Sequence, residues 1–175
     1  GVALPVAWWG AHGLLVLLMQ GLEWALQMPG AVWYVPTAPI ALQALGLLGA
    51  VVFMLSYLPW RWRLSGALLI GPMLWPPVDA PEHGQFVLTA LDVGQGTAVL
   101  VQTQNHVLLY DAGPLYSRES DAGVRVVVPY LRAKGFAQLD ALVLSHRDAD
   151  HVGGAKAVMN ALPVRWLTSS LEPEH

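Results

Sequence analysis

Charged residues are almost absent from the first half of this chain, and this feature constrains its fold more than any other. Between residues 1 and 80 the charged side chains are Glu23, Arg61, Arg63 and Asp79. The whole chain is 55% hydrophobic and 12% charged. Apolar surface on this scale must be buried in lipid or against protein, which argues against a soluble domain over the full length. We therefore predict a membrane α-helical segment followed by an α/β region.

Three apolar stretches are predicted to form the helices of the membrane segment. They cover residues 4–28, 39–58 and 64–75. The second stretch carries about 20 residues without a charge, which is enough to cross a hydrocarbon core of about 30 Å. We expect residues 1–77 to form transmembrane helices of a channel domain and residues 78–84 to form a linker.

Three charged residues suggest how these helices are placed. Glu23 is a candidate channel-facing group, because a carboxylate within a span normally faces protein or a water-filled path. The alternative is an acidic residue at a helix end near lipid headgroups. Arg61 and Arg63 indicate that the loop after the second stretch is cytoplasmic, since Lys and Arg concentrate on cytoplasmic loops. If the third stretch crosses the membrane once, we expect everything after Pro77 to lie outside the cytoplasm.

From residue 85 onward the pattern becomes that of an α/β domain. Runs rich in β-branched and other apolar residues predict strands, and Gln104-Asn105 between two of these runs predicts a hairpin. Gly135 is expected to end a helix, and Trp166 is expected in the core. The predicted strands are residues 86–91, 97–103, 107–110, 139–144 and 164–169, and the predicted helices are residues 126–134 and 153–162.

The segment from Ser145 to Gly154 carries most of the predicted chemistry. Metal ligands must converge to about 2.0–2.2 Å from the ion, and a loop that leaves a buried strand can aim several side chains at one point. The spacing here suits a turn, and a solvated polar turn without a metal is the alternative. Gly153-Gly154 then allows close backbone packing where a helix begins. Four candidate ligands fall within six positions: His146, Asp148, Asp150 and His151.

This pattern resembles the His-x-His-x-Asp-His motif of the metallo-β-lactamase superfamily. Upstream, Asp111-Ala112-Gly113 looks like that superfamily's Asp-Gly element at a strand end, whose carboxylate supports the metal loop from behind. The resemblance implies that residues 85–175 form the N-terminal half of a metallo-β-lactamase-like domain, which is a partial αββα sandwich.

Further motifs narrow the resemblance to one group. The sequence Leu-Asp-Val-Gly-Gln-Gly at residues 91–96, the sequence Val-Pro-Tyr-Leu-Arg at residues 128–132 and the preceding apolar helices are similar to ComEC-type competence proteins. These proteins carry DNA across the inner membrane during natural transformation. The resemblance implies part of a DNA uptake channel with a metal-dependent hydrolase or nuclease domain that degrades the strand not imported. Its partners would be DNA, the lipid bilayer and other competence proteins.

The resemblance also assigns roles to the four ligands. His146 and Asp148 would contribute to one metal ion, and Asp150 and His151 would contribute to a second. Asp150 would in addition hold the attacking water, which makes it the catalytic residue. Asp148 stands where most superfamily members have a histidine, a substitution that competence proteins commonly share. An oxygen ligand there shifts the preference from zinc toward manganese or magnesium, so we expect two divalent ions, Zn or Mn, in the full-length protein.

Supporting roles are predicted for Asp92, Asp111, Gly153 and Gly154. Asp92 either orients its turn through hydrogen bonds to the backbone or lies near the metals. Asp111 either caps a turn or supports a metal ligand. Thr97 replaces an aspartate often found after the Gly-Gln-Gly turn, which weakens any role for that position.

We interpret the sequence as part of a longer protein, because the chain starts at Gly1 and its polar end lacks a closing element. The remaining ligands are expected beyond residue 175, so this part alone is expected to bind metal weakly and not to hydrolyse DNA. The absence of cysteine excludes disulfides and Cys-ligated zinc. Two rival functions stay open, namely a transporter whose β-lactamase-like domain is a non-catalytic docking module and a membrane-anchored phosphoesterase.

Overall fold

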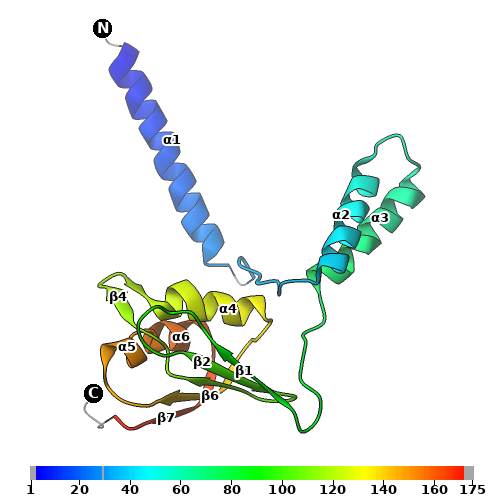
Figure 1. Cartoon of the computed structure of the whole chain (residues 1–175). Helices are drawn as coiled ribbons and strands as arrows, with labels where there is room; N and C mark the ends of the chain where they lie inside the picture. The colour runs from blue at the N-terminus through cyan, green and yellow to red at the C-terminus, as the bar shows by residue number, and fades with distance from the viewer. Residues whose placement is uncertain (1–2, 29, 172–175) are drawn as a thin grey trace. The chain divides into compact units, whose positions relative to one another are not determined.

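The structure is a computed structural model that describes residues 3–28 and 30–171, and it divides the chain into two compact units, residues 1–34 and 35–175. The first unit contains a single long helix, α1 (Ala3–Leu26), of 24 residues (Figure 1). Its side chains from residue 7 to residue 26 are exposed, including Glu23. The channel-facing role of Glu23 therefore stays a prediction.

Within the described ranges, no helix combines the length and the apolar character needed to cross a membrane.

The second unit begins with a helical hairpin formed by α2 (Ile40–Met54) and α3 (Trp60–Leu74). The helix predicted over residues 39–58 is wrong in length, because Leu55 leaves the helical conformation and Pro59 follows. The helix predicted over residues 64–75 begins earlier. The carbonyl of Pro59 accepts hydrogen bonds from the N–H groups of the third and fourth residues after it, which starts α3 at Trp60.

Glycines let the two helices of this hairpin pack backbone against backbone. A Cβ atom on Gly49 would lie 2.5 Å from the carbonyl oxygen of Gly66, and one on Gly66 would lie 2.7 Å from that of Gly49. At Gly46 a Cβ atom would press on the side chain of Met73. The contact thus depends on the missing side chains, as is usual where helices approach closely.

We expect Gly66→Ala to destabilise the hairpin, because the added methyl group meets backbone that cannot move aside. The expected cost is about 1–3 kcal/mol, the usual range for overpacking. Ser65→Ala, at the exposed position next to Gly66 in the same helix, is the matched control, since it removes a hydroxyl group and adds no volume. Its expected effect is within about 0.5 kcal/mol. Thermal unfolding followed by far-UV circular dichroism would compare the two, and equal effects would contradict the packing account.

The second unit also contains a five-stranded mixed sheet in the order β1-β2-β3-β6-β7 (Figure 1). The first three strands pair antiparallel, whereas β3, β6 and β7 pair parallel. All five strands were predicted, and only β1 and β2 are shorter than expected. The strands are β1 (Phe86–Ala90), β2 (Val99–Thr103), β3 (Val107–Tyr110), β6 (Leu139–Leu144) and β7 (Val164–Ser169).

Helical elements and a short hairpin connect these strands. Between β3 and β6 lie β4 (Leu115–Ser117), β5 (Ser120–Asp121), the π-helix η1 (Gly123–Val127) and α4 (Val128–Ala133). The helix predicted over residues 126–134 therefore starts too late, because Asp121 Oδ1 already accepts a hydrogen bond from the N–H of Val124 at 2.8 Å. Gly135, at φ +81°, ends it as predicted.

The helix predicted over residues 153–162 corresponds to α6 (Ala155–Ala161), and a short helix that was not predicted, α5 (Ala149–Val152), precedes it. The two glycines of the sequence motif separate them. Figure 1 shows α4, α5 and α6 together on one side of the sheet. The metal-loop candidates Asp150 and His151 therefore lie in a helical turn and not in an open loop.

The core lies between the sheet and these helices. Leu100, Leu109 and Leu142 are opposite one another on three neighbouring strands, and each is at most 2% exposed. Side chains from η1, α4 and α6 cover this row. They include Val127, Leu131 and Val158, all fully buried.

The opposite face of the sheet carries a second apolar row. Leu88, Val101, Leu108, Ala141 and Trp166 are consecutive partners across all five strands. Trp166 is 69% exposed there, so its predicted place in the core is wrong. Alternate residues of a strand face opposite sides, and nothing in the order of apolar residues along β7 shows which side is buried. Among the described residues, this face has no second large sheet over it.

The carboxylate of Asp140, near the start of β6, stabilises the sheet. Its Oδ2 accepts a hydrogen bond from the N–H of Val107 at 2.8 Å, and its Oδ1 lies 3.4 Å from His106 Nδ1. The hydrogen bond from Val107 is the main reason why the pKa of Asp140 is lowered, and His106 and Arg165 lower it further.

A lowered pKa in the folded state means that the ionised Asp140 stabilises the fold above the unfolded pKa of about 3.9, and that this contribution is lost as pH falls through the folded value. Asp140→Asn is therefore expected to lower the urea midpoint at pH 7 and to lower it less at pH 2. Asp79→Asn, at an exposed carboxylate, is the control. An equal loss for Asp140→Asn at both pH values would contradict the assignment.

Candidate metal centre

The candidate centre is built where two parallel strands end side by side. β3 and β6 are paired from Leu108 with Ala141 to Tyr110 with Val143, so the residues that follow them leave the sheet at the same edge. The N–H of Asp111 extends the pairing by donating to the carbonyl of Val143 at 2.8 Å. Residues 145–148 then lead from β6 into α5, which places the predicted metal loop directly beside Asp111.

Asp111 is the fully buried centre of a hydrogen-bond network. Its Oδ1 accepts a hydrogen bond from the N–H of Ser145 at 2.8 Å, and its Oδ2 accepts one from Ser145 Oγ at 2.8 Å. Oδ2 also lies 2.7 Å from His151 Nδ1. The backbone of Asp111 has a φ of 57°, a left-handed conformation that aspartate tolerates better than most residues. One carboxylate therefore fixes both the start of the loop and the imidazole in α5.

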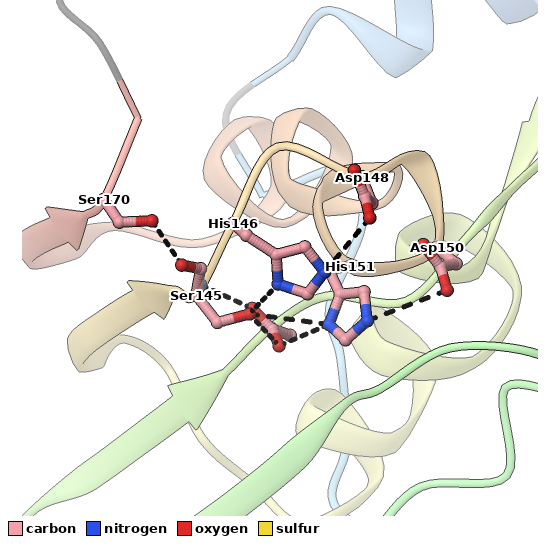
Figure 2. Close-up of polar contacts among 7 residues, drawn as sticks. Ser145, His146, Asp148, Asp150, His151 and Ser170 are labelled. Atoms are coloured by element: carbon pink, nitrogen blue, oxygen red, sulfur yellow. Dashed lines mark hydrogen bonds and ion pairs between the residues drawn. The ribbon is translucent and has the colours of Figure 1, made fainter.

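Two imidazole and carboxylate pairs lie on the solvent side of this network, as Figure 2 shows. His146 Nε2 is 3.4 Å from Asp148 Oδ2, and His151 Nε2 is 3.7 Å from Asp150 Oδ2. The two rings are close, with centroids 3.9 Å apart and planes tilted by 49°. The side chains of His146 and Asp148 are 46% and 68% exposed, whereas that of His151 is 18% exposed.

The imidazole and carboxylate groups are of the types that bind a divalent cation, but too few of them converge on one point. Both Nδ1 atoms are engaged with the network behind the loop, so both Nε2 atoms point toward carboxylates. Imidazole nitrogen and carboxylate oxygen are ligands that zinc and manganese accept. Within residues 3–28 and 30–171, however, no three such side chains converge as a metal would require. The structure brings the four predicted ligands together as two pairs.

The glycine-rich turn at residues 94–96, before β2, packs against the backbone of α5. Thr97 donates its N–H to the carbonyl of Asp150 at 3.2 Å, and Gly96 lies so close that a Cβ atom there would overlap the same oxygen. Asp92 Oδ1 accepts a hydrogen bond from the N–H of Gly94 at 3.3 Å. The turn-orienting alternative for Asp92 thus corresponds to a contact in the structure, while a role near metals stays a prediction.

Gly153 and Gly154 lie where the backbone packs most closely. A Cβ atom on Gly153 would overlap the backbone of Pro114 and Leu115, and one on Gly154 would overlap the backbone carbonyl of Ala112. Ala112 also donates its N–H to the carbonyl of His151 at 2.8 Å. These contacts join α5 to the segment after β3, so the two glycines act on the loop through its backbone.

Sequence reasoning missed two contributors. Ser145 was noted only as the first residue of the motif, yet its Oγ contacts Asp111 and both imidazoles. Ser170, just after β7, donates from its Oγ to the carbonyl of Ser145. A serine next to a ligand pattern is the signal that could have indicated the first, but nothing in the sequence indicates the second.

Comparison with known proteins agrees with this geometry. Residues 91–175 match the metallo-β-lactamase superfamily. The chain is 38% identical to competence protein ComA of Neisseria gonorrhoeae over 128 residues, which are 71% of this chain and 17% of that protein. It is 36% identical to ComE operon protein 3 of Bacillus subtilis (strain 168) over 89 residues, which are 44% of this chain and 12% of that protein. The chain belongs to the ComEC-type competence family.

Another relative is the uncharacterized protein YcaI of Escherichia coli (strain K12), which is 31% identical over 133 residues, or 69% of this chain and 17% of that protein. This member of the ComEC-type family thus spans less than a fifth of the length of the curated relatives it matches. No solved structure matches the chain. The mixed sheet with helices on one face is the part of the predicted fold that the structure and the superfamily match support.

Proposed function

We propose that this chain belongs to a DNA uptake apparatus of natural transformation and carries half of a metal-dependent phosphodiesterase site. The observation that carries the proposal is the pairing of two imidazoles with two carboxylates in front of the buried Asp111. Two of the relatives are competence proteins, and this relationship suggests DNA as the substrate of such a hydrolase-like domain. The substrate would be the DNA strand that is not imported.

The proposed ligands are His146 and Asp148 for one divalent ion and Asp150 and His151 for a second, with Zn or Mn as the ions. A bound metal would lower the pKa of water to about 7 and so supply a nucleophile near neutral pH. The Asp150 carboxylate would accept a hydrogen bond from the attacking water and orient it. Asp111 and the turn before β2 would keep Asp150 and His151 in place during this step.

Four donors in two pairs do not complete two metal sites, because each zinc or manganese ion needs at least four ligands. Further histidines and a bridging carboxylate would have to come from chain beyond residue 175. We therefore expect the 175-residue chain alone to bind metal weakly and not to hydrolyse DNA. Micromolar metal affinity with nuclease turnover from this chain would contradict the expectation.

The proposed domain organisation follows the contrast between the two parts of the sequence. Residues 1–77 would be membrane helices of a competence or channel domain, residues 78–84 a linker, and residues 85–175 the N-terminal half of an αββα metallo-β-lactamase-like domain. Large apolar side chains of the helical hairpin support membrane contact, since Met54 and Leu68 are each 78% exposed.

The protein would be a multi-pass inner-membrane protein with its hydrolase-like domain on the periplasmic or extracellular side, and Glu23 would face the channel. Lipid and other competence proteins would be its partners.

The test is Asp150→Ala in the full-length protein, measured as hydrolysis of labelled DNA by the purified protein with added Mn²⁺ or Zn²⁺. Loss of a group that orients the nucleophile is expected to lower the rate about 100-fold or more. Glu119→Ala, at an exposed carboxylate between β4 and β5, is the control and should keep full activity. Unchanged hydrolysis in Asp150→Ala would remove the loop from the mechanism.

One observation favours a second candidate, a non-catalytic docking module. In the part of the chain that the structure describes, no three metal-binding side chains converge. A full-length protein that transports DNA normally but binds neither Mn²⁺ nor Zn²⁺ would support this function over hydrolysis. A membrane-anchored phosphoesterase has no such observation in its favour.

A further inference from the structure

The hydroxyl group of Ser145 lies between the buried carboxylate and both imidazoles. Its Oγ is 2.8 Å from Asp111 Oδ2, 2.8 Å from His146 Nδ1 and 3.5 Å from His151 Nδ1 (Figure 2). A hydroxyl group has one proton to donate and two lone pairs that accept. Which neighbour receives the proton therefore decides the hydrogen-bonding role of the others.

The proton of Ser145 goes to Asp111. An ionised carboxylate can only accept hydrogen bonds, and hydrogen bonds to a charged acceptor are the stronger ones. Asp111 is fully buried and depends on protein donors, whereas the side chain of His146 is 46% exposed and can turn to water. Because the Oγ proton is committed, the 2.8 Å contact with His146 requires the imidazole to donate through Nδ1–H.

The same reasoning applies to His151, whose Nδ1 is 2.7 Å from Asp111 Oδ2 and must also donate. In their neutral forms both rings then carry the proton on Nδ1 and an unshared electron pair on Nε2. Each of these pairs faces a carboxylate, at 3.4 Å for His146 and 3.7 Å for His151. The unshared electron pair and the carboxylate oxygen of each pair repel each other unless a metal cation or a second ring proton lies between them.

We propose that Ser145 is a positioning residue that fixes the Nδ1–H tautomer of His146 and so keeps His146 Nε2 available to a divalent cation. The proposal rests on the metal-dependent function proposed above. Asp111 accepts the Nδ1–H of His151 directly, and the hydroxyl group of Ser145 links Asp111 to Nδ1 of His146. Without the hydroxyl group, His146 would be free to place its proton on Nε2 and donate it to Asp148, which would block that nitrogen.

The first test reads the tautomers directly. Nitrogen-15 NMR of the 175-residue chain, labelled at histidine and recorded without metal at pH 8.5, distinguishes Nδ1–H from Nε2–H. This pH is about two units above the ordinary imidazole pKa of about 6.5. His146 is expected as Nδ1–H in the wild type and in Ser145→Thr, and mainly as Nε2–H in Ser145→Ala. His151 is the internal control, since Asp111 still holds its Nδ1–H in Ser145→Ala.

Substitutions of His146 and His151 by Gln assign the two sets of signals. Ser169→Ala removes a neighbouring exposed hydroxyl at the end of β7 and should change neither ring. An Nε2–H tautomer of His146 in the wild type would overturn the proposal, and this outcome does not depend on whether any variant folds. An unchanged tautomer in a folded Ser145→Ala protein would overturn it as well.

The second test measures binding of Mn²⁺ alone by calorimetry to the full-length protein and to full-length proteins that carry the same substitutions. Loss of a group that orients a metal ligand typically costs about 10–100-fold in metal affinity. We expect this loss in Ser145→Ala and recovery in Ser145→Thr, while Ser169→Ala binds as the wild type does. Equal affinity in Ser145→Ala would overturn the proposal even if the full-length protein proves to be a nuclease. A tautomer change without hydrolysis by the full-length protein would support the role of Ser145 while the nuclease function fails.

Discussion

Asp111→Ala is expected to destabilise the β-lactamase-like part of the chain strongly. The substitution leaves the N–H and Oγ of Ser145 and the Nδ1 of His151 without the acceptor that they share. Removing one member of a buried charged network costs about 3–5 kcal/mol. Alanine also tolerates the left-handed backbone at this position, φ 57°, less well than aspartate does.

Asp111→Asn separates the charge from the backbone conformation, because asparagine accepts a left-handed conformation. We expect a smaller loss of stability, about 1–3 kcal/mol, from the weaker hydrogen bonds. The amide nitrogen would donate to His151 Nδ1 and force the proton of that ring onto Nε2. Metal affinity is then expected to fall about 10–100-fold although the protein stays folded.

Urea unfolding followed by tryptophan fluorescence and calorimetric titration with Mn²⁺ would measure both effects. Asp148→Ala is the control for stability, since its side chain is 68% exposed and its loss should change stability by no more than about 0.5 kcal/mol. If Asp111→Ala and Asp148→Ala unfold at the same urea concentration, the buried network does not stabilise the fold as proposed.

The parts of this protein that could be predicted from its sequence are those encoded locally. The strand at residues 139–144 is apolar except for Asp140, and the ligand pattern follows it within a few positions. Gly135 follows residues that favour a helix and can adopt a positive φ, so the end of α4 was predictable as well. In each case the residues that determine the structure are neighbours in the chain.

The parts that could not be predicted depend on contacts between distant residues. Ser145 acquires its role from Asp111, which lies 34 positions earlier and comes near only because β3 and β6 pair in parallel. The place of Trp166 depends on which side of β7 faces the helices, and that is set by its register with β6. The length of α2 depends on the backbone at Leu55, and the uncharged residues from there to Leu58 do not show that the helix has already ended.

Gly96 shows how such a distant contact can control the candidate site. Its φ of 111° lies in a region that residues with side chains rarely adopt, and the carbonyl oxygen of Asp150 occupies the space of a Cβ atom. We expect Gly96→Ala to strain the turn by about 1–3 kcal/mol. To relieve the overlap, α5 must move away from the turn, and this movement would also weaken the hydrogen bond from the Thr97 N–H to the same oxygen.

Gly94→Ala provides the matched comparison, because Gly94 is in the same turn, has a φ of 77° and has nothing within 4 Å of its Cβ position. Its expected cost is about 1–2 kcal/mol of backbone strain, with no effect on α5. Mn²⁺ affinity should therefore fall about 10–100-fold in Gly96→Ala and stay unchanged in Gly94→Ala. Equal affinities in the two variants would mean that the turn stabilises the fold without positioning Asp150, and the proposed route from the Gly-Gln-Gly motif to the metal loop would be wrong.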